Sequence, residues 1–317
     1  MADLPARFNN ILRIGTRGSR LARWQSDYIA ELLRETYPDA QIEIEVISTK
    51  GDQILDKPLP AIGGKGLFTL ELETALHEGR IDCAVHSLKD LPTDNPDGLV
   101  VGAIPKRAPV ADVLVSRAGL ALADLPHGAT IGTSSRRRAA QLHACRSDLN
   151  IIDIRGNVPT RINKCLDPNG PYDAIVLAQA GVTRLGLDEH ITQVLDFDMM
   201  LPAPGQGAIG VQCRAGDDAV FALLTDEATR LAVTAERAFL NKLEGGCSVP
   251  VAALASVRDE QLTLHARVID LAGTPLIHVD LSSLLNGEAI TQADKLGRDA
   301  AAEAITQGAA EILEALR

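Results

Sequence analysis

The fold is decided by the stretch Ile81-Asp82-Cys83-Ala84-Val85-His86-Ser87-Leu88-Lys89-Asp90-Leu91-Pro92. Its segment 83–85 is short, apolar and bounded by polar residues, which is typical of a buried strand. Pro92 prevents a long helix from following at once, so Lys89 and Asp90 are expected in the loop beyond the carboxyl end of that strand. Ligands bind at such ends in open α/β sheets. A Lys-Asp pair is also common in a solvated turn, and the local sequence leaves both interpretations open.

The composition is that of a globular protein with a net negative charge. The 317 residues suggest about two domains, and 46% hydrophobic with 23% charged residues is sufficient for packed cores. A net charge of -11 and an aromatic content of 3% argue against nucleic-acid binding, because neither phosphates nor bases would meet a complementary surface. No apolar run is long enough to span a membrane, and residues 1–5 lack the features of a signal peptide. A cytoplasmic location is therefore expected.

The cysteines, at positions 83, 145, 165, 213 and 247, are odd in number and widely spaced, without a Cys-x-x-Cys pair. We therefore predict neither a disulfide framework nor a metal site. Cys247 is distinctive because two glycines precede it and Ser-Val-Pro follows. The glycines can end the preceding helix and expose the thiol. A small buried side chain, a nucleophile and a covalent attachment point all remain open for Cys247 at this stage.

Hydrophobic periodicity divides the chain into two α/β units and a small α+β unit. Residues 105–109 mark a boundary, and residues 201–214 are expected to form a hinge and a strand that returns to the first unit. A helix from Ser19 is expected to bury the face formed by Leu21, Trp24, Tyr28 and Leu32. The predicted domains are 1–105 together with about 205–224, 106–204, and 225–317.

Arginines lie at three turns where a predicted strand leads into a helix, namely 15–19, 132–138 and 154–161. A helix N-terminus is the positive end of the helix dipole, so a cation there is unfavourable by roughly a few tenths of a kcal/mol. The arrangement is favourable if an anion lies between the helix starts and the arginines. A solvated surface cluster is the alternative, but three such turns in a net-acidic chain favour an anion site.

Phosphate is the less favoured anion. The segment Gly63-Gly64-Lys65-Gly66 lacks the upstream glycine and the following Ser or Thr of a phosphate loop, and no dinucleotide-binding fingerprint is present. The surrounding stretch 48–66 is a long predicted loop, which is uncommon unless it is functional or mobile. A ligand with several carboxylates is therefore favoured.

Seven short motifs lie along roughly residues 11–257. They are Thr16-Arg17-x-Ser19, Gly63-Gly64-Lys65-Gly66-Leu67-Phe68, Val85-His86-Ser87-Leu88-Lys89-Asp90, Gly132-Thr133-Ser134-Ser135-x-Arg137-Arg138, Arg155-Gly156-Asn157-Val158, Pro204-Gly205-Gln206-Gly207 and Leu243-Glu244-Gly245-Gly246-Cys247. Each alone is weak, but their combination is specific, and in content and order it resembles the porphobilinogen deaminase family.

This resemblance implies an α/β fold with two periplasmic-binding-protein-like domains, a cleft between them that holds the active site, and a small C-terminal α+β domain. It implies a dipyrromethane cofactor attached to Cys247 through a thioether. The family's transferase adds four porphobilinogen molecules head to tail, with loss of ammonia each time, and releases the linear tetrapyrrole hydroxymethylbilane by hydrolysis. Pyrrole acetate and propionate groups match the anion expected at the arginine turns. A monomer without nucleic-acid or membrane partners is expected.

The resemblance assigns Asp90 the catalytic role. An ionised Asp90 would stabilise the cationic species left when ammonia departs, and it would also move protons. Arg20, Arg23 and Arg136 depart from the family pattern, and whether these charges join the site stays open. The residues expected to bind cofactor or substrate are Arg17, Ser19, Lys65, Ser87, Lys89, Thr133, Ser135, Arg137, Arg138, Arg155, Gly156, Asn157, Arg161, Arg184 and Gln206.

A solute-binding protein is the main alternative, because two α/β lobes, a hinge and an anion site describe such a protein equally well. The third domain with its accessible cysteine, and the expected absence of an export signal, argue against it. A nucleotide-dependent enzyme is disfavoured by the incomplete phosphate-loop motif.

Overall fold

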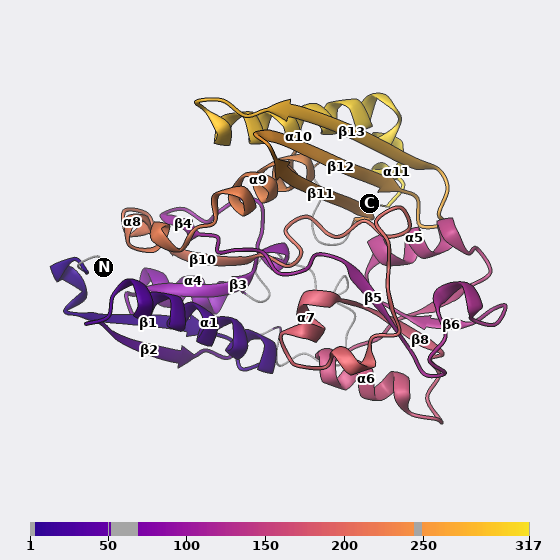
Figure 1. The fold of residues 1–317 in the computed structure, drawn as a ribbon, viewed down its shortest axis with the longest axis horizontal. Helices are drawn as coiled ribbons and strands as arrows, with labels where there is room; N and C mark the ends of the chain where they lie inside the picture. Colours follow the sequence, from indigo (N-terminus) through magenta and orange to yellow (C-terminus); the bar gives the residue numbers. More distant parts are fainter. Residues whose placement is uncertain (1–3, 50, 52–68, 244–248, 317) are drawn as a thin grey trace. The chain divides into compact units, whose positions relative to one another are not determined.

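The computed structural model describes residues 4–49, 51, 69–243 and 249–316, which fold into two compact units (Figure 1). The first unit comprises Met1–Arg107 with Ala208–Arg230, and the second comprises Ala108–Gly207 with Leu231–Arg317. The three-domain division with boundaries at 105, 204 and 224 stays a prediction.

The first unit is built on a five-stranded sheet with the order β2-β1-β3-β10-β4. Strand β1 runs parallel to β2 and β3, whereas β10 runs antiparallel to β3 and β4. Helix α1 (Arg20–Thr36) contributes to one apolar core with the sheet, and helix α4 (Leu70–His77) to another. The strands are β1 (Ile11–Thr16), β2 (Gln41–Val46), β3 (Cys83–Ser87), β4 (Leu99–Ala103) and β10 (Ile209–Arg214).

The buried face of helix α1 overlaps only in part with the predicted one. Its buried residues are Ala22, Gln25, Ser26, Ile29, Ala30 and Leu33. Trp24 is 37% exposed and stacks on Tyr28 with 5.6 Å between the ring centroids. The prediction is correct for Tyr28 and Leu32, which are half-buried and pack against the core of the first unit, and wrong for Trp24.

The second unit contains a sheet of the same topology, with the order β7-β6-β8-β5-β9. Strand β6 runs parallel to β7 and β8, and β5 runs antiparallel to β8 and β9. Helices α5 (Arg136–Cys145), α6 (Val158–Leu166) and α7 (Gln179–Thr183) follow β6, β7 and β8. The strands are β5 (Asp112–Ser116), β6 (Thr130–Gly132), β7 (Asn150–Ile152), β8 (Ala174–Ala178) and β9 (Gln193–Val194).

The C-terminal part of the second unit has an apolar core of its own. Strands β11 (Val251–Arg258), β12 (Gln261–Ile269) and β13 (Leu276–Leu284) form an antiparallel sheet. Helices α9 (Glu227–Lys242), α10 (Ala289–Thr306) and α11 (Ala309–Glu314) supply the remaining core residues (Figure 1). Gly308, with a φ of +102°, separates α10 from α11. The α/β class with a small α+β part is thereby confirmed.

Candidate functional site

The first unit brings several predicted residues to one edge of its sheet. Strands β1 and β3 are parallel neighbours, so Arg17 and the segment Ser87–Asp90 follow their carboxyl ends on the same side. Burial lowers the pKa of His86 to about 4, and the nearby Arg17 charge acts in the same direction. The buried His86 imidazole, near the carboxyl end of β3, is therefore neutral at physiological pH.

Asp90 ends a short 3-10 turn, Leu88–Asp90, rather than lying in an irregular loop. The turn is anchored by buried Leu88, whereas Lys89 is half-buried and Asp90 is exposed. The Gln25 amide of α1 donates a hydrogen bond of 2.9 Å to Ser87 Oγ, so helix and strand end are tied together. The carboxylate of Asp90 is thus held on a fixed backbone and accessible to a ligand.

Two residues of the predicted site, Ser19 and Asn157, cap helices through their side chains. Ser19 Oγ accepts a hydrogen bond from the Ala22 amide at the start of α1 (3.2 Å). Asn157 Oδ1 accepts from the Thr160 amide (3.0 Å) and from its hydroxyl (2.7 Å) at the start of α6. These oxygens fix where α1 and α6 begin, and each satisfies one backbone amide of the first helical turn.

The turn before α6 contains a glycine in the left-handed region of backbone conformation. Gly156 has a φ of +115°, and a Cβ there would lie 2.9 Å or less from side-chain carbons of Thr160. Arg161 Nε donates to the Gly156 carbonyl at 2.8 Å. Gly156 is therefore required for the shape of the turn that carries half-buried Arg155.

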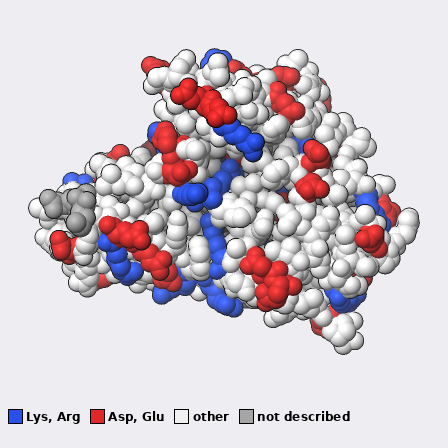
Figure 2. Space-filling view, in the orientation of Figure 1, with Lys and Arg blue, Asp and Glu red and all other residues white. Residues whose placement is uncertain are grey.

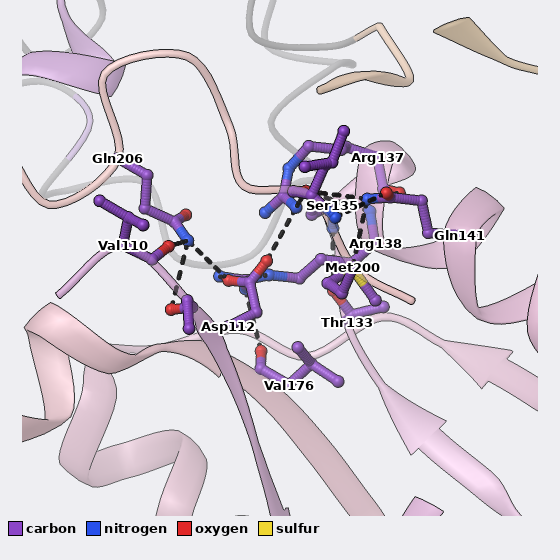
Figure 3. Close-up of polar contacts among 12 residues, drawn as sticks. Val110, Asp112, Thr133, Ser135, Arg137, Arg138, Gln141, Val176, Met200 and Gln206 are labelled. Carbon is purple, nitrogen blue, oxygen red and sulfur yellow. Dashed lines mark hydrogen bonds and ion pairs between the residues drawn. The ribbon is translucent and has the colours of Figure 1, made fainter. Parts of the chain in front are cut away.

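Helix α5 begins with a buried ionic network (Figure 3). Asp112, at the start of β5, is 0% exposed, and Arg137 and Arg138 are 4% and 6% exposed. Arg138 donates through Nε and Nη2 to Asp112 Oδ1 at 3.1 and 2.7 Å, and Arg137 Nη1 lies 2.8 Å from Oδ2. Burial alone raises the pKa of Asp112, but the two guanidinium groups outweigh it and hold that pKa well below its usual range.

Further contacts engage the same arginines. Arg138 Nη1 donates to the Val176 carbonyl at 2.9 Å, and Arg137 Nη1 donates to the Leu201 carbonyl. Ser135 Oγ caps α5 by accepting from the Arg138 amide at 3.4 Å, and Thr133 Oγ1 accepts from the Ser135 amide at 3.2 Å. The arginines predicted to meet a ligand thus have an internal carboxylate partner.

Gln206 and Arg184 contact the segments that connect the units. The Gln206 amide donates to the Val110 carbonyl at 2.8 Å and to Asp112 Oδ1 at 3.0 Å. Arg184 Nη2 donates to the Gly207 carbonyl at 2.8 Å. Both residues, predicted as ligand-binding, therefore have structural contacts within the second unit.

Asp112 was missed by sequence reasoning. Its only signal is an acidic residue at the start of the otherwise apolar strand Asp-Val-Leu-Val, a position that is usually solvated.

Two residues of the predicted site, Lys65 and Cys247, lie outside the described residues. On the face shown in Figure 2, basic side chains gather in groups although the chain is net acidic. Among the described residues, no helix combines the length and apolarity that a membrane span requires.

The comparison with solved structures finds matches of low similarity. One is a YaeC-family lipoprotein from Enterococcus faecalis, with a TM-score of 0.40, 15% identity and coverage of 70% of this chain and 93% of that chain. Another is the substrate binding domain of a putative molybdenum ABC transporter from Clostridium difficile, with a TM-score of 0.40, 12% identity and coverage of 69% and 94%.

Two family models match the sequence. "Porphobilinogen deaminase, dipyromethane cofactor binding domain" matches residues 12–222, and "Porphobilinogen deaminase, C-terminal domain" matches residues 230–306.

Curated proteins named porphobilinogen deaminase are similar over most of the chain. The protein from Xanthomonas oryzae pv. oryzae is 51% identical over 309 residues, covering 96% of this chain and 99% of its own. That from Syntrophotalea carbinolica is 46% identical over 311 residues, covering 97% and 96%. Two five-stranded mixed sheets, with arginine-bearing turns at their strand ends, define an α/β protein. The chain belongs to the porphobilinogen deaminase family.

Proposed function

We propose that this protein deaminates porphobilinogen and joins four molecules of it head to tail, releasing hydroxymethylbilane by hydrolysis. The observation that carries the proposal is the match of the chain to both porphobilinogen deaminase domain models, over residues 12–222 and 230–306. Relatives of that name align along nearly their whole length. The cytoplasm is the proposed location, and a monomer without nucleic-acid partners is the proposed state.

Asp90 is the proposed catalytic residue. Its carboxylate is exposed at the end of a turn anchored by buried Leu88. A positive charge develops on the substrate as ammonia leaves, and a fixed carboxylate stabilises such a charge without having to reorganise. Within hydrogen-bond reach of a pyrrole nitrogen, the same oxygen accepts and returns a proton.

The arginine turns are the proposed carboxylate-binding elements. Arg17 follows β1 in the first unit, and Arg155 and Arg161 flank the start of α6 in the second. Arginine binds a carboxylate through paired N–H donors, and a helix N-terminus adds backbone donors of the same polarity. This donor set fits the acetate and propionate groups of pyrroles. The full proposed set also includes Ser19, Lys65, Ser87, Lys89, Thr133, Ser135, Arg137, Arg138, Gly156, Asn157, Arg184 and Gln206.

A dipyrromethane group is the proposed cofactor, attached by a thioether to Cys247. When bound, it supplies the terminal pyrrole on which the chain is extended. The described residues fit such a group through the chemistry of their donors, because guanidinium groups and capped helix starts recur at the strand ends of both units. The attachment residue itself lies outside the described part of the chain.

The test is the intact mass of purified protein before and after incubation with porphobilinogen. We expect a mass excess of two pyrrole units, release of ammonia and a linear tetrapyrrole product. Cys247→Ser should lack the excess, whereas Cys145→Ser, which removes an exposed thiol, should retain it. No ammonia from holoprotein would refute the activity, and an unchanged excess in Cys247→Ser would refute the attachment site. A tightly bound carboxylate ligand that is released unchanged would instead support a solute-binding protein.

A further inference from the structure

A cluster of metal-ligating side chains lies on the C-terminal sheet, in a part of the chain that the proposed function does not use. His265 of β12 and Asp280 of β13 are directly opposed in the antiparallel ladder, and His278 precedes Asp280 by two residues on the same face. All three side chains are exposed. Their arrangement is fixed by backbone pairing that is continuous from Gln261↔Leu284 to Ile269↔Leu276.

The three side chains already converge on one point. His265 Nδ1 lies 2.6 Å and His278 Nε2 lies 2.9 Å from Asp280 Oδ1. One potential ligand atom from each residue lies within 4.8 Å of the others. Zinc–ligand bonds of about 2.0–2.2 Å place tetrahedral ligand atoms about 3.3–3.6 Å apart, farther than the two contacts to Asp280 but within the 4.8 Å spanned by the cluster. Small rotations of the exposed side chains therefore suffice to admit an ion.

We propose that His265, His278 and Asp280 form a binding site for a divalent transition-metal ion, with Zn²⁺ as the best fit. Two imidazoles and one carboxylate are a common zinc donor set, and water completes the coordination. Mg²⁺ and Ca²⁺ are disfavoured because they prefer ligands that are all oxygen. The proposal is independent of the deaminase activity, and it revises the prediction of no metal site, which considered cysteine spacing alone.

Arg267 limits the affinity of this site. Its Nε donates to His278 Nδ1 at 3.2 Å, which leaves the imidazole proton on Nε2 and pointing at Asp280. Ligation through Nε2 requires the other tautomer, with the proton on Nδ1, and so ends the Arg267 contact. Arg267 keeps its bonds to Gln141 Oε1 (3.3 Å) and to the Asp198 carbonyl (2.9 Å). We therefore expect a reversible site rather than a permanent structural zinc.

The experiment titrates the full-length protein with Zn²⁺ in competition with a chromophoric chelator. We expect a single site whose affinity falls at least about tenfold in the double variant His265→Ala/His278→Ala. Because both side chains are exposed, the variant should keep the fold, and thermal unfolding checks this. The matched control is His127→Ala, another exposed histidine, which should leave the affinity unchanged. Equal zinc affinity in the double variant would overturn the proposal.

The absorption spectrum of bound Co²⁺ identifies the type of ligand atom directly. Co²⁺ bound to nitrogen and oxygen donors gives visible ligand-field bands without the near-ultraviolet charge transfer of a thiolate complex. We expect this spectrum to disappear in the double variant and to persist in Cys145→Ser. Thiolate bands that vanish in Cys145→Ser would show adventitious cysteine binding only and would refute the site.

Discussion

At Asp90, a single carboxylate is held at the end of a turn whose apolar residue is buried. We expect Asp90→Asn to keep the fold and the cofactor mass but to lower turnover by about 100-fold or more, because the amide carries no negative charge and is a poor proton acceptor. Asp97→Asn, at an exposed position of the same connection, is the control. Steady-state ammonia release measures both variants. Near-normal turnover in Asp90→Asn would remove this residue from the mechanism.

Asp112 is the residue on which the start of α5 depends. Asp112→Asn leaves Arg137 and Arg138 buried without a countercharge, so we expect the free energy of unfolding to fall by about 3–5 kcal/mol. Asp294→Asn removes half of an exposed pair with Arg298 and should cost less than about 1 kcal/mol. Chemical denaturation followed by circular dichroism distinguishes the two. Equal effects would mean that the network contributes little to stability.

The ionisation of Asp112 makes the free energy of unfolding depend on pH. The folded-state pKa of Asp112 is depressed, so its stabilisation is present above the unfolded-state value of about 3.9 and is lost as the pH falls through the folded-state value. The stability difference between wild type and Asp112→Asn should therefore be constant near neutrality and shrink below about pH 4. A difference that grows on acidification would contradict the sign of the shift.

At the scale of an element, substitutions of Asn157 distinguish helix capping from ligand binding at the start of α6. Asn157 caps the helix, and an aspartate at this position caps as well and suits the helix dipole. We expect Asn157→Asp to retain or slightly raise the melting temperature and Asn157→Ala to cost about 1 kcal/mol. If α6 binds substrate carboxylates, Asn157→Asp also raises KM, because the new charge repels them. An unchanged KM would indicate that this helix start has only a structural role.

The whole molecule sets two electrostatic effects against each other. A net charge of -11 repels a polycarboxylate, whereas the arginine turns attract it. Salt screens both, since the Debye length falls from about 10 Å at 0.1 M to about 3 Å at 1 M. At 0.1 M salt the acidic groups more than about 10 Å from the ligand are already largely screened, so further salt mainly weakens attraction to the nearby arginines. We therefore expect KM for porphobilinogen to rise with salt above 0.1 M. A KM that falls with salt would show that the global charge dominates and would contradict the arginine-cradle proposal.

Much of the local structure followed from the sequence. The buried strand predicted at 83–85 lies within β3, and the helix predicted from Ser19 begins directly after that residue, which caps it. Ser135 and Asn157 cap helices at two other arginine-bearing turns. Apolar runs, β-branched residues and caps act over a few neighbouring residues, so a linear pattern is sufficient to reveal them. The family motifs likewise identified the class of chemistry without knowledge of any contact.

The tertiary structure decided which long-range partners these residues meet. The sequence does not indicate that Asp112 neutralises Arg137 and Arg138, because the contact joins positions about 25 residues apart through the pairing order of a sheet. The buried face of α1 and the meeting of His265 with Asp280 are of the same kind. Burial and ion pairing depend on what packs opposite a side chain, and only the folded chain determines that neighbour.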